Sequence, residues 1–137
     1  MSQDSDLLRS VLVVDDDPSV RRAIVRMLSV RGYSVREAES GAQALKVLAL
    51  PDAPRLAVVD WNMKTMSGPE LCRILRARKP HVYVVLMTAE SGGRVLSDAM
   101  SSGADVYLQK PFHPNELAAR LLAGRASLRA SDEREGS

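Results

Sequence analysis

The segment LAVVDWNMKTMSG, residues 56–68, determines both the fold and the place of the functional site. Its first four residues are apolar and rich in β-branched valine, which predicts a short strand buried on both faces. The apolar run stops at Asp60. Residues at the carboxyl end of a buried strand in an α/β sheet line the crevice where such sheets bind ligands. Asp60 is therefore the first functional candidate.

Working outward from this segment, the chain alternates between strand and helix patterns. Short β-branched runs predict strands, and apolar residues spaced three and four apart predict helices. The predicted strands cover residues 10–15, 34–38, 56–60, 82–88 and 105–108. The predicted helices cover residues 18–31, 41–50, 69–78, 94–102 and 114–129. This alternation predicts a doubly wound α/β fold, with a five-stranded parallel sheet and helices on both faces.

The domain boundaries follow from the same pattern. The predicted domain covers residues 10–129, preceded by an N-terminal extension over residues 1–9 and followed by a polar C-terminal tail over residues 130–137. Within the domain, Asp17 is expected to cap the helix that begins at Pro18. In that helix Arg21, Arg22 and Arg26 are expected to point outward.

Composition narrows the class of protein. A chain of 137 residues, 45% apolar and 26% charged, fits one globular domain. The formal net charge is only +2, and the basic residues are dispersed, which argues against direct nucleic-acid or membrane binding. The polar N-terminus is unlike a signal peptide. A single cysteine, Cys72, cannot form an internal disulfide, so we expect a cytoplasmic protein.

Polar or charged residues lie at the carboxyl ends of several predicted strands. Asp15 and Asp16 end the first strand, Thr88 ends the fourth, and Lys110 follows the fifth. Because the carboxyl ends of parallel strands lie on one edge, these residues should converge with Asp60. Clustered carboxylates without nearby His or Cys favour Mg²⁺. A metal, a lysine and a carboxylate nucleophile suit phosphoryl transfer.

Four segments carry a family resemblance. VLVVDDDPSVRR, VVDWNMKTMSG, VVLMTAE and GADVYLQKPF resemble, in order and spacing, the signature segments of the receiver domain of two-component response regulators. The resemblance covers roughly residues 10–125 and is closest to the single-domain chemotaxis-type regulator. It implies a flavodoxin-like sheet of strand order 2-1-3-4-5.

The resemblance implies a role for each acid. Asp60 would accept a phosphoryl group from a phosphohistidine on a sensor histidine kinase or a phosphotransfer protein. Asp16 and Asp60 would ligate Mg²⁺ directly, and Asp15 would help through a water molecule. Asn62 would offer its backbone carbonyl to the metal.

It also implies roles for the other strand-end residues. Lys110, the Thr88 hydroxyl and the Ala89 N–H would bind phosphoryl oxygens. Tyr107 matches the switch aromatic that turns inward when Thr88 moves, although a plain core aromatic explains it equally well. The Lys110–Pro111 peptide is expected to be cis.

Three further positions bear on the phosphoryl group. Asn62 and Glu90 match the positions where the family tunes self-dephosphorylation, and this pair resembles that of short-lived regulators. Lys64 departs from the family, which usually has proline after the methionine. Lysine frees the backbone φ angle and adds a charge near the site.

The resemblance places the output surface on residues 94–101, Tyr107 and residues 116–120. The partner would be a downstream target protein or an output domain, and the receiver a monomer or a weak phosphorylation-dependent dimer. The chain is expected to be either a stand-alone regulator or the receiver piece of a longer protein.

Other classes fit less well. A Mg²⁺-dependent aspartyl-phosphate phosphatase usually has a second acid two residues after its nucleophile, where this chain has Asn62. A nucleotide switch would need a G-x-x-x-x-G-K-[ST] motif, which does not occur. A phosphorylation-independent protein-binding receiver is disfavoured by the complete acceptor set. We therefore expect a signalling domain, whose only catalysis is its own phosphotransfer and autodephosphorylation.

Overall fold

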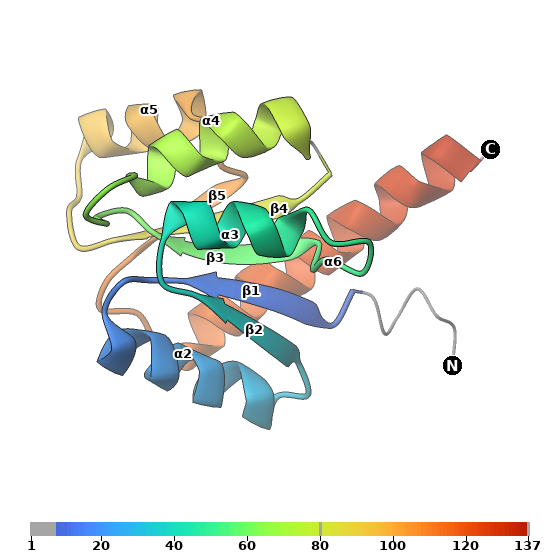
Figure 1. The fold of residues 1–137 in the computed structure, drawn as a ribbon, viewed down its shortest axis with the longest axis horizontal. Coiled ribbons are helices and arrows are strands. Elements are labelled where there is room, and N and C mark those ends of the chain that lie inside the picture. The colour runs from blue at the N-terminus through green and yellow to red at the C-terminus, as the bar shows by residue number, and fades with distance from the viewer. Residues whose placement is uncertain (1–7, 80, 137) are drawn as a thin grey trace.

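The computed structural model describes residues 8–79 and 81–136, and over these it has the predicted alternation of strands and helices (Figure 1). The strands are β1 (Ser10–Val14), β2 (Ser34–Ala38), β3 (Leu56–Asp60), β4 (Tyr83–Thr88) and β5 (Val106–Gln109). The helices are α2 (Pro18–Val30), α3 (Gly41–Leu48), α4 (Gly68–Arg78), α5 (Gly93–Ser101) and α6 (Pro114–Gly136). All pairings are parallel in the order β2-β1-β3-β4-β5, which confirms the predicted fold class and strand order.

The central strand is β3, which pairs with β1 on one side and β4 on the other. Val14 lies opposite Val59, and Asp60 lies opposite Met87. Every residue of β3 is buried, as its apolar run predicts. This pairing brings the carboxyl ends of β1, β3 and β4 to one edge of the sheet, which lies to the left in Figure 1.

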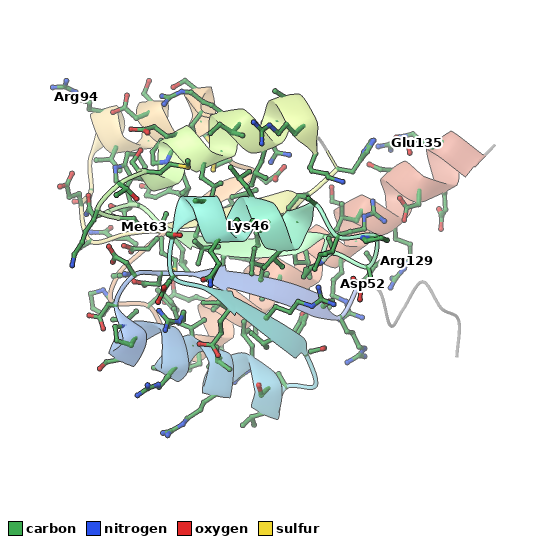
Figure 2. All side chains as sticks on the ribbon, in the orientation of Figure 1. Lys46, Asp52, Met63, Arg94, Arg129 and Glu135 are labelled. Carbon is green, nitrogen blue, oxygen red and sulfur yellow. The ribbon has the colours of Figure 1, made fainter. Side chains whose placement is uncertain are left out.

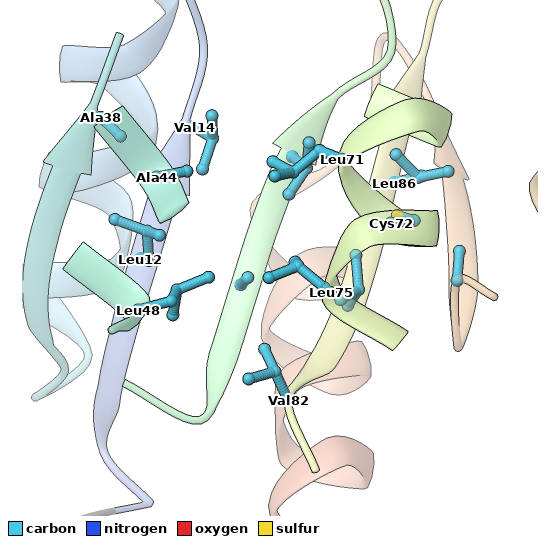
Figure 3. Close-up of a cluster of buried hydrophobic side chains, with 14 of the residues drawn as sticks. Leu12, Val14, Ala38, Ala44, Leu48, Leu71, Cys72, Leu75, Val82 and Leu86 are labelled. Atoms are coloured by element: carbon cyan, nitrogen blue, oxygen red, sulfur yellow. The ribbon is translucent and has the colours of Figure 1, made fainter. Parts of the chain in front are cut away.

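Helices cover both faces of the sheet. The α3, α4 and α5 helices contribute to one core cluster and α2 and α6 to the other. Figure 3 shows the first cluster, in which Leu71 and Leu75 of α4 pack toward the sheet beside Leu48 of α3. Alternate residues of β1 point to opposite clusters, so Leu12 belongs to the first and Val13 to the second.

The last helix, α6, is longer than predicted. It was expected to end near Arg129 before a polar tail, but it continues to Gly136, past the amino ends of the strands (Figure 1). Its last turns are stabilised by a bidentate ion pair, in which Arg55 donates to both carboxylate oxygens of Asp132 at 2.7 and 2.9 Å. The polar residues 130–135 are also compatible with a helix, because they include neither proline nor glycine.

The described fold also begins before the expected boundary. Leu8 is 1% exposed and packs in the second core cluster with Leu28 and Leu128. Residues 1–7 of the expected extension lie outside the described residues. The packed domain therefore includes Leu8, which sequence reasoning assigned to a polar N-terminal stretch.

A smaller expectation, the helix cap at Asp17, is confirmed. Asp17 caps α2, since its side chain accepts hydrogen bonds from the N–H groups of Ser19 and Val20 at 2.9 and 3.3 Å. Cys72 is a fully buried side chain of α4, and burial raises the pKa of its thiol to about 11.

Across the described residues, every helix is too short or too polar to cross a lipid bilayer.

Gly68 provides a test of how closely the start of α4 packs against the end of β3. A Cβ atom at this position would lie 2.6 Å from the Asp60 carbonyl oxygen and 2.7 Å from Leu86 Cδ2. We expect Gly68→Ala to lower the free energy of unfolding by about 1–3 kcal/mol, because backbone and core must shift to accommodate the methyl group. Urea denaturation measures the change.

Gly93→Ala is the matched control for this substitution. Gly93 also lies at the start of a helix, but its added Cβ would meet no described atom within 4 Å. We expect this variant to be as stable as the wild type or slightly more stable, since alanine favours helix. Equal stability of the Gly68→Ala variant and the control would contradict close packing at Gly68.

Candidate functional site

Three carboxylates converge at the carboxyl edge of the sheet. Asp15 and Asp16 directly follow β1, and Asp60 is the last residue of β3. Each offers one carboxylate oxygen, and these atoms all lie within 4.8 Å of one another. Asp15 and Asp60 are buried, whereas Asp16 is partly exposed. The convergence expected from the strand ends is therefore present.

The surroundings of Asp15 are unfavourable for its negative charge. Its side chain is 2% exposed, and its Oδ1 accepts a hydrogen bond from the Asp17 N–H at 2.9 Å. Its Oδ2 is buried without a hydrogen-bond partner among the described residues and lies 3.8 Å from Lys110 Nζ. Burial raises the pKa of Asp15, and the negative charge of Asp60 raises it further.

Lys110 brings the positive charge of the site. Its Nζ donates to Asp60 Oδ1 at 2.6 Å, and its main-chain N–H donates to the Thr88 carbonyl at 2.7 Å. The second bond ties the end of β5 to the end of β4. The Lys110–Pro111 peptide is cis, as the family resemblance implied.

Thr88 lies at the same edge, and its hydroxyl oxygen accepts one hydrogen bond. The side chain is 1% exposed, and its Oγ1 accepts a hydrogen bond from the Glu90 N–H at 3.1 Å. A hydroxyl that accepts one hydrogen bond still has its own O–H to donate. Ala89, between these residues, is exposed, so its N–H belongs to a surface loop.

The carboxylate oxygens of this site are suitable ligands for a magnesium ion. Lys110 forms ion pairs with two of the three carboxylates, and the buried Oδ2 of Asp15 accepts no hydrogen bond from the described residues, so a cation would satisfy it. Mg²⁺ prefers oxygen ligands at about 2.1 Å and retains several water molecules. Asp16 is partly exposed, so water can reach this part of the site.

The loop between β3 and α4 forms one wall of the site. Asn62 and Lys64 are exposed in this loop, and Met63, labelled in Figure 2, lies between them. The Lys64 main-chain N–H donates to Asp16 Oδ2 at 3.1 Å. The loop is closed by a hydrogen bond from the Gly68 N–H to the Trp61 carbonyl at 2.9 Å.

Tyr107 lies within β5, and Glu90 lies two residues after the end of β4. Tyr107 pairs in register with Leu86 and packs, partly buried, against the first core cluster. Glu90 is exposed just after Thr88. The structure is therefore compatible with both readings of Tyr107, a core aromatic and a movable one.

Sequence reasoning missed one supporting residue, Arg21. It was expected to point outward, but its Nη1 donates to the Asp15 carbonyl at 2.7 Å and its Nε pairs with Glu37 at 3.0 Å. It thus stabilises the main chain of the acidic loop, the segment after β1 that carries Asp15, Asp16 and Asp17. Helical spacing could not reveal this contact, because a long side chain on the outer face of α2 folds back over the loop.

The chain matches known proteins along most of its length. The profile of the response regulator receiver domain matches residues 11–122. Response regulator MprA of Mycolicibacterium vanbaalenii is 39% identical over 127 residues, which are 93% of this chain and 53% of that protein. MprA of Mycobacterium bovis (strain BCG / Pasteur 1173P2) is 41% identical over 113 residues, which are 82% and 49% of the two chains. The chain thus spans about half the length of these curated relatives.

Solved structures agree with the sequence matches. Chemotaxis protein CheY4 of Vibrio cholerae has a TM-score of 0.75 and 27% identity, over 83% of this chain and 96% of that one. A response regulator receiver protein from Pseudomonas putida has a TM-score of 0.76 and 26% identity, over 83% and 95%. With its fold, its acidic site and these matches in agreement, the chain belongs to the response regulator receiver domain family of two-component signalling.

Proposed function

We propose that this receiver domain is phosphorylated on Asp60 in a Mg²⁺-dependent reaction. The observation that carries the proposal is the convergence of Asp60 with two further carboxylates and with Lys110 Nζ, 2.6 Å from its Oδ1. Phosphoryl transfer depends mainly on positioning and on neutralising charge. A buried acceptor carboxylate beside a fixed ammonium group meets both needs.

The proposed donor is a phosphohistidine on a sensor histidine kinase or a phosphotransfer protein. A carboxylate oxygen of Asp60 forms a bond to phosphorus while the N–P bond of the donor breaks, and that electron pair returns to the imidazole nitrogen. Lys110 and the Thr88 hydroxyl then bind the phosphoryl oxygens, with the Ala89 N–H beside them. Their placement at the ends of β4 and β5 supports these roles.

Asp15, Asp16 and Asp60 would hold Mg²⁺, with the backbone carbonyl of Asn62 as a further ligand. The ion, when bound, would neutralise charge on the acids and on the transferring group. The chain's own contribution is to fix these ligands. Arg21 and Asp17 hold the main chain and the carboxylate of Asp15, so the ligands are arranged in advance.

Phosphorylation would be transmitted through Thr88 and Tyr107 to α5, β5 and the first turns of α6. A target protein or an output domain would bind there, and the receiver would be a monomer or a weak phosphorylation-dependent dimer. The exposed Leu96 and Met100 of α5, 44% and 51% accessible, support a binding role for this surface. We place this signalling step in the cytoplasm, where a lone cysteine stays reduced.

The phosphoacceptor role is tested by intact mass after incubation with acetyl phosphate and Mg²⁺. We expect the wild type to gain one phosphoryl group and Asp60→Asn to gain none, because an amide is a poor nucleophile. Asp17→Asn is the matched control, since asparagine caps a helix as well as aspartate does. It should be phosphorylated like the wild type.

A wild type that stays unmodified with both acetyl phosphate and a histidine kinase would contradict the proposal. The phosphorylation-independent binding module would then be the better account. Modification that persists in Asp60→Asn would move the acceptor to another residue.

The strain on Asp15 predicts a pH effect on stability. A raised pKa means that the folded protein binds this proton more readily than the unfolded chain, so Asp15 destabilises the fold when ionised. In chelator, we expect this cost to disappear as the pH falls through the raised pKa toward the ordinary value of 3.8. Asp15→Asn should remove it at neutral pH, raising stability by about 1 kcal/mol and Tm by roughly 4 °C.

Thermal melts from pH 4 to pH 8 measure this effect. Mg²⁺ should stabilise the wild type and have much less effect on Asp15→Asn, since binding to the folded state raises Tm. Equal melting curves of the two proteins in chelator would contradict the strained state of Asp15.

The exposed pair Asn62 and Glu90 is proposed to set the lifetime of the phosphoryl group. Both are exposed and follow strand ends of the site, Asn62 two residues after Asp60 and Glu90 two residues after Thr88, so water would have access beside them. We expect the double variant Asn62→Met and Glu90→Leu to lose its phosphoryl group about tenfold more slowly, or ~1.4 kcal/mol in the barrier. Decay followed by mass spectrometry, with the exposed Lys46→Met on α3 as control, measures it. An unchanged rate would refute the role.

A further inference from the structure

The hydrogen bond from the Lys64 main-chain N–H to Asp16 Oδ2 joins two walls of the site. The 3.1 Å contact links the loop after β1 to the loop after β3, between residues 48 positions apart in the chain. Proline, the residue that the resembled family usually has here, lacks an N–H and could not make this bond. Lysine at this position therefore provides a donor directed at a proposed metal ligand.

The three acids differ in how firmly they are held. Asp15 accepts a hydrogen bond from the Asp17 N–H, and Asp60 accepts one from Lys110 Nζ. For the Asp16 carboxylate, the Lys64 N–H is the one hydrogen-bond donor that the described residues provide. Asp16 is also the most exposed of the three acids. The orientation of its carboxylate thus depends on a single main-chain bond.

Open space beside Asp16 makes this bond important. A cavity of about 270 Å³ lies next to the site. Its lining residues are Asp16, Glu39, Ser40, Met63, Lys64 and Thr65. None of the other described lining residues donates a hydrogen bond to Asp16, so without the Lys64 bond its carboxylate would be free to rotate in this space.

We propose that Lys64 is a positioning residue, which holds Asp16 toward the metal position through its main-chain N–H and not through its ammonium group. A carboxylate has about four lone-pair sites, so Asp16 keeps acceptor capacity for an ion while Oδ2 is bound to Lys64. Hydrogen-bond partners of metal ligands commonly change metal affinity by tenfold or more. The inference rests on the proposed Mg²⁺ site.

Two substitutions separate the main chain from the side chain. Lys64→Ala removes the ammonium group and keeps the N–H, whereas Lys64→Pro removes both. We expect Lys64→Ala to bind Mg²⁺ within about twofold of the wild type and Lys64→Pro about tenfold more weakly. Affinity is measured without a phosphoryl donor, from Trp61 fluorescence and from the rise of Tm with Mg²⁺ concentration.

Hydrogen exchange on the metal-free protein gives a test that needs no proline. The Lys64 amide should exchange slowly in the wild type and much faster in Asp16→Ala, which lacks the acceptor. Fast exchange of this amide in the wild type would overturn the inference even if Lys64→Pro failed to fold. Circular dichroism checks the fold of each variant.

The outcomes distinguish this inference from the proposed function. A wild type that binds no Mg²⁺ and accepts no phosphoryl group would overturn both. A wild type that does both, with Lys64→Pro binding Mg²⁺ as well as Lys64→Ala, would overturn only the role of the N–H. Equal weakening in both variants would assign the effect to the ammonium group and likewise overturn the inference.

Discussion

The parallel pairing of β3 with both β1 and β4 is the constraint on which the rest of the structure depends. It places Asp60 beside the residue pair that follows β1 and opposite Met87, one residue before Thr88. Repulsion among the acids opposes this arrangement, and the apolar burial of the strands and the ammonium group of Lys110 offset it. The fold therefore holds together charges that would separate in water. The clustered carboxylates can bind a cation, and the ammonium group can bind the oxygens of a phosphoryl group.

The sequence was most informative where side-chain character alone fixes the position of a residue. Buried strands require apolar runs, and the polar residues that end those runs must lie at the sheet edge, so the sequence alone predicts that Asp15, Asp60, Thr88 and Lys110 converge. The cap at Asp17 follows from equally local rules. Strand order and the cis proline came from the family resemblance, since local patterns determine neither.

Long-range polar contacts were not predictable in the same way. The last turns of α6 contain mostly charged residues, so nothing in their pattern indicated packing, and their anchor Arg55 lies 77 positions away. The bracing of the acidic loop by Arg21 and Lys64 involves a backbone carbonyl in one case and a backbone N–H in the other. Every residue except proline has both groups, so the identity of a residue rarely reveals their use.

The buried thiol of Cys72 has a practical consequence for studying conformational change. It is the single cysteine of the chain, it is inaccessible, and its high pKa leaves almost no thiolate at neutral pH. Maleimide dyes and spin labels react with exposed thiolates, so the natural protein should remain unlabelled. A cysteine introduced on the outer face of α5 would then carry the only probe, and motions of that helix could be followed without first replacing Cys72.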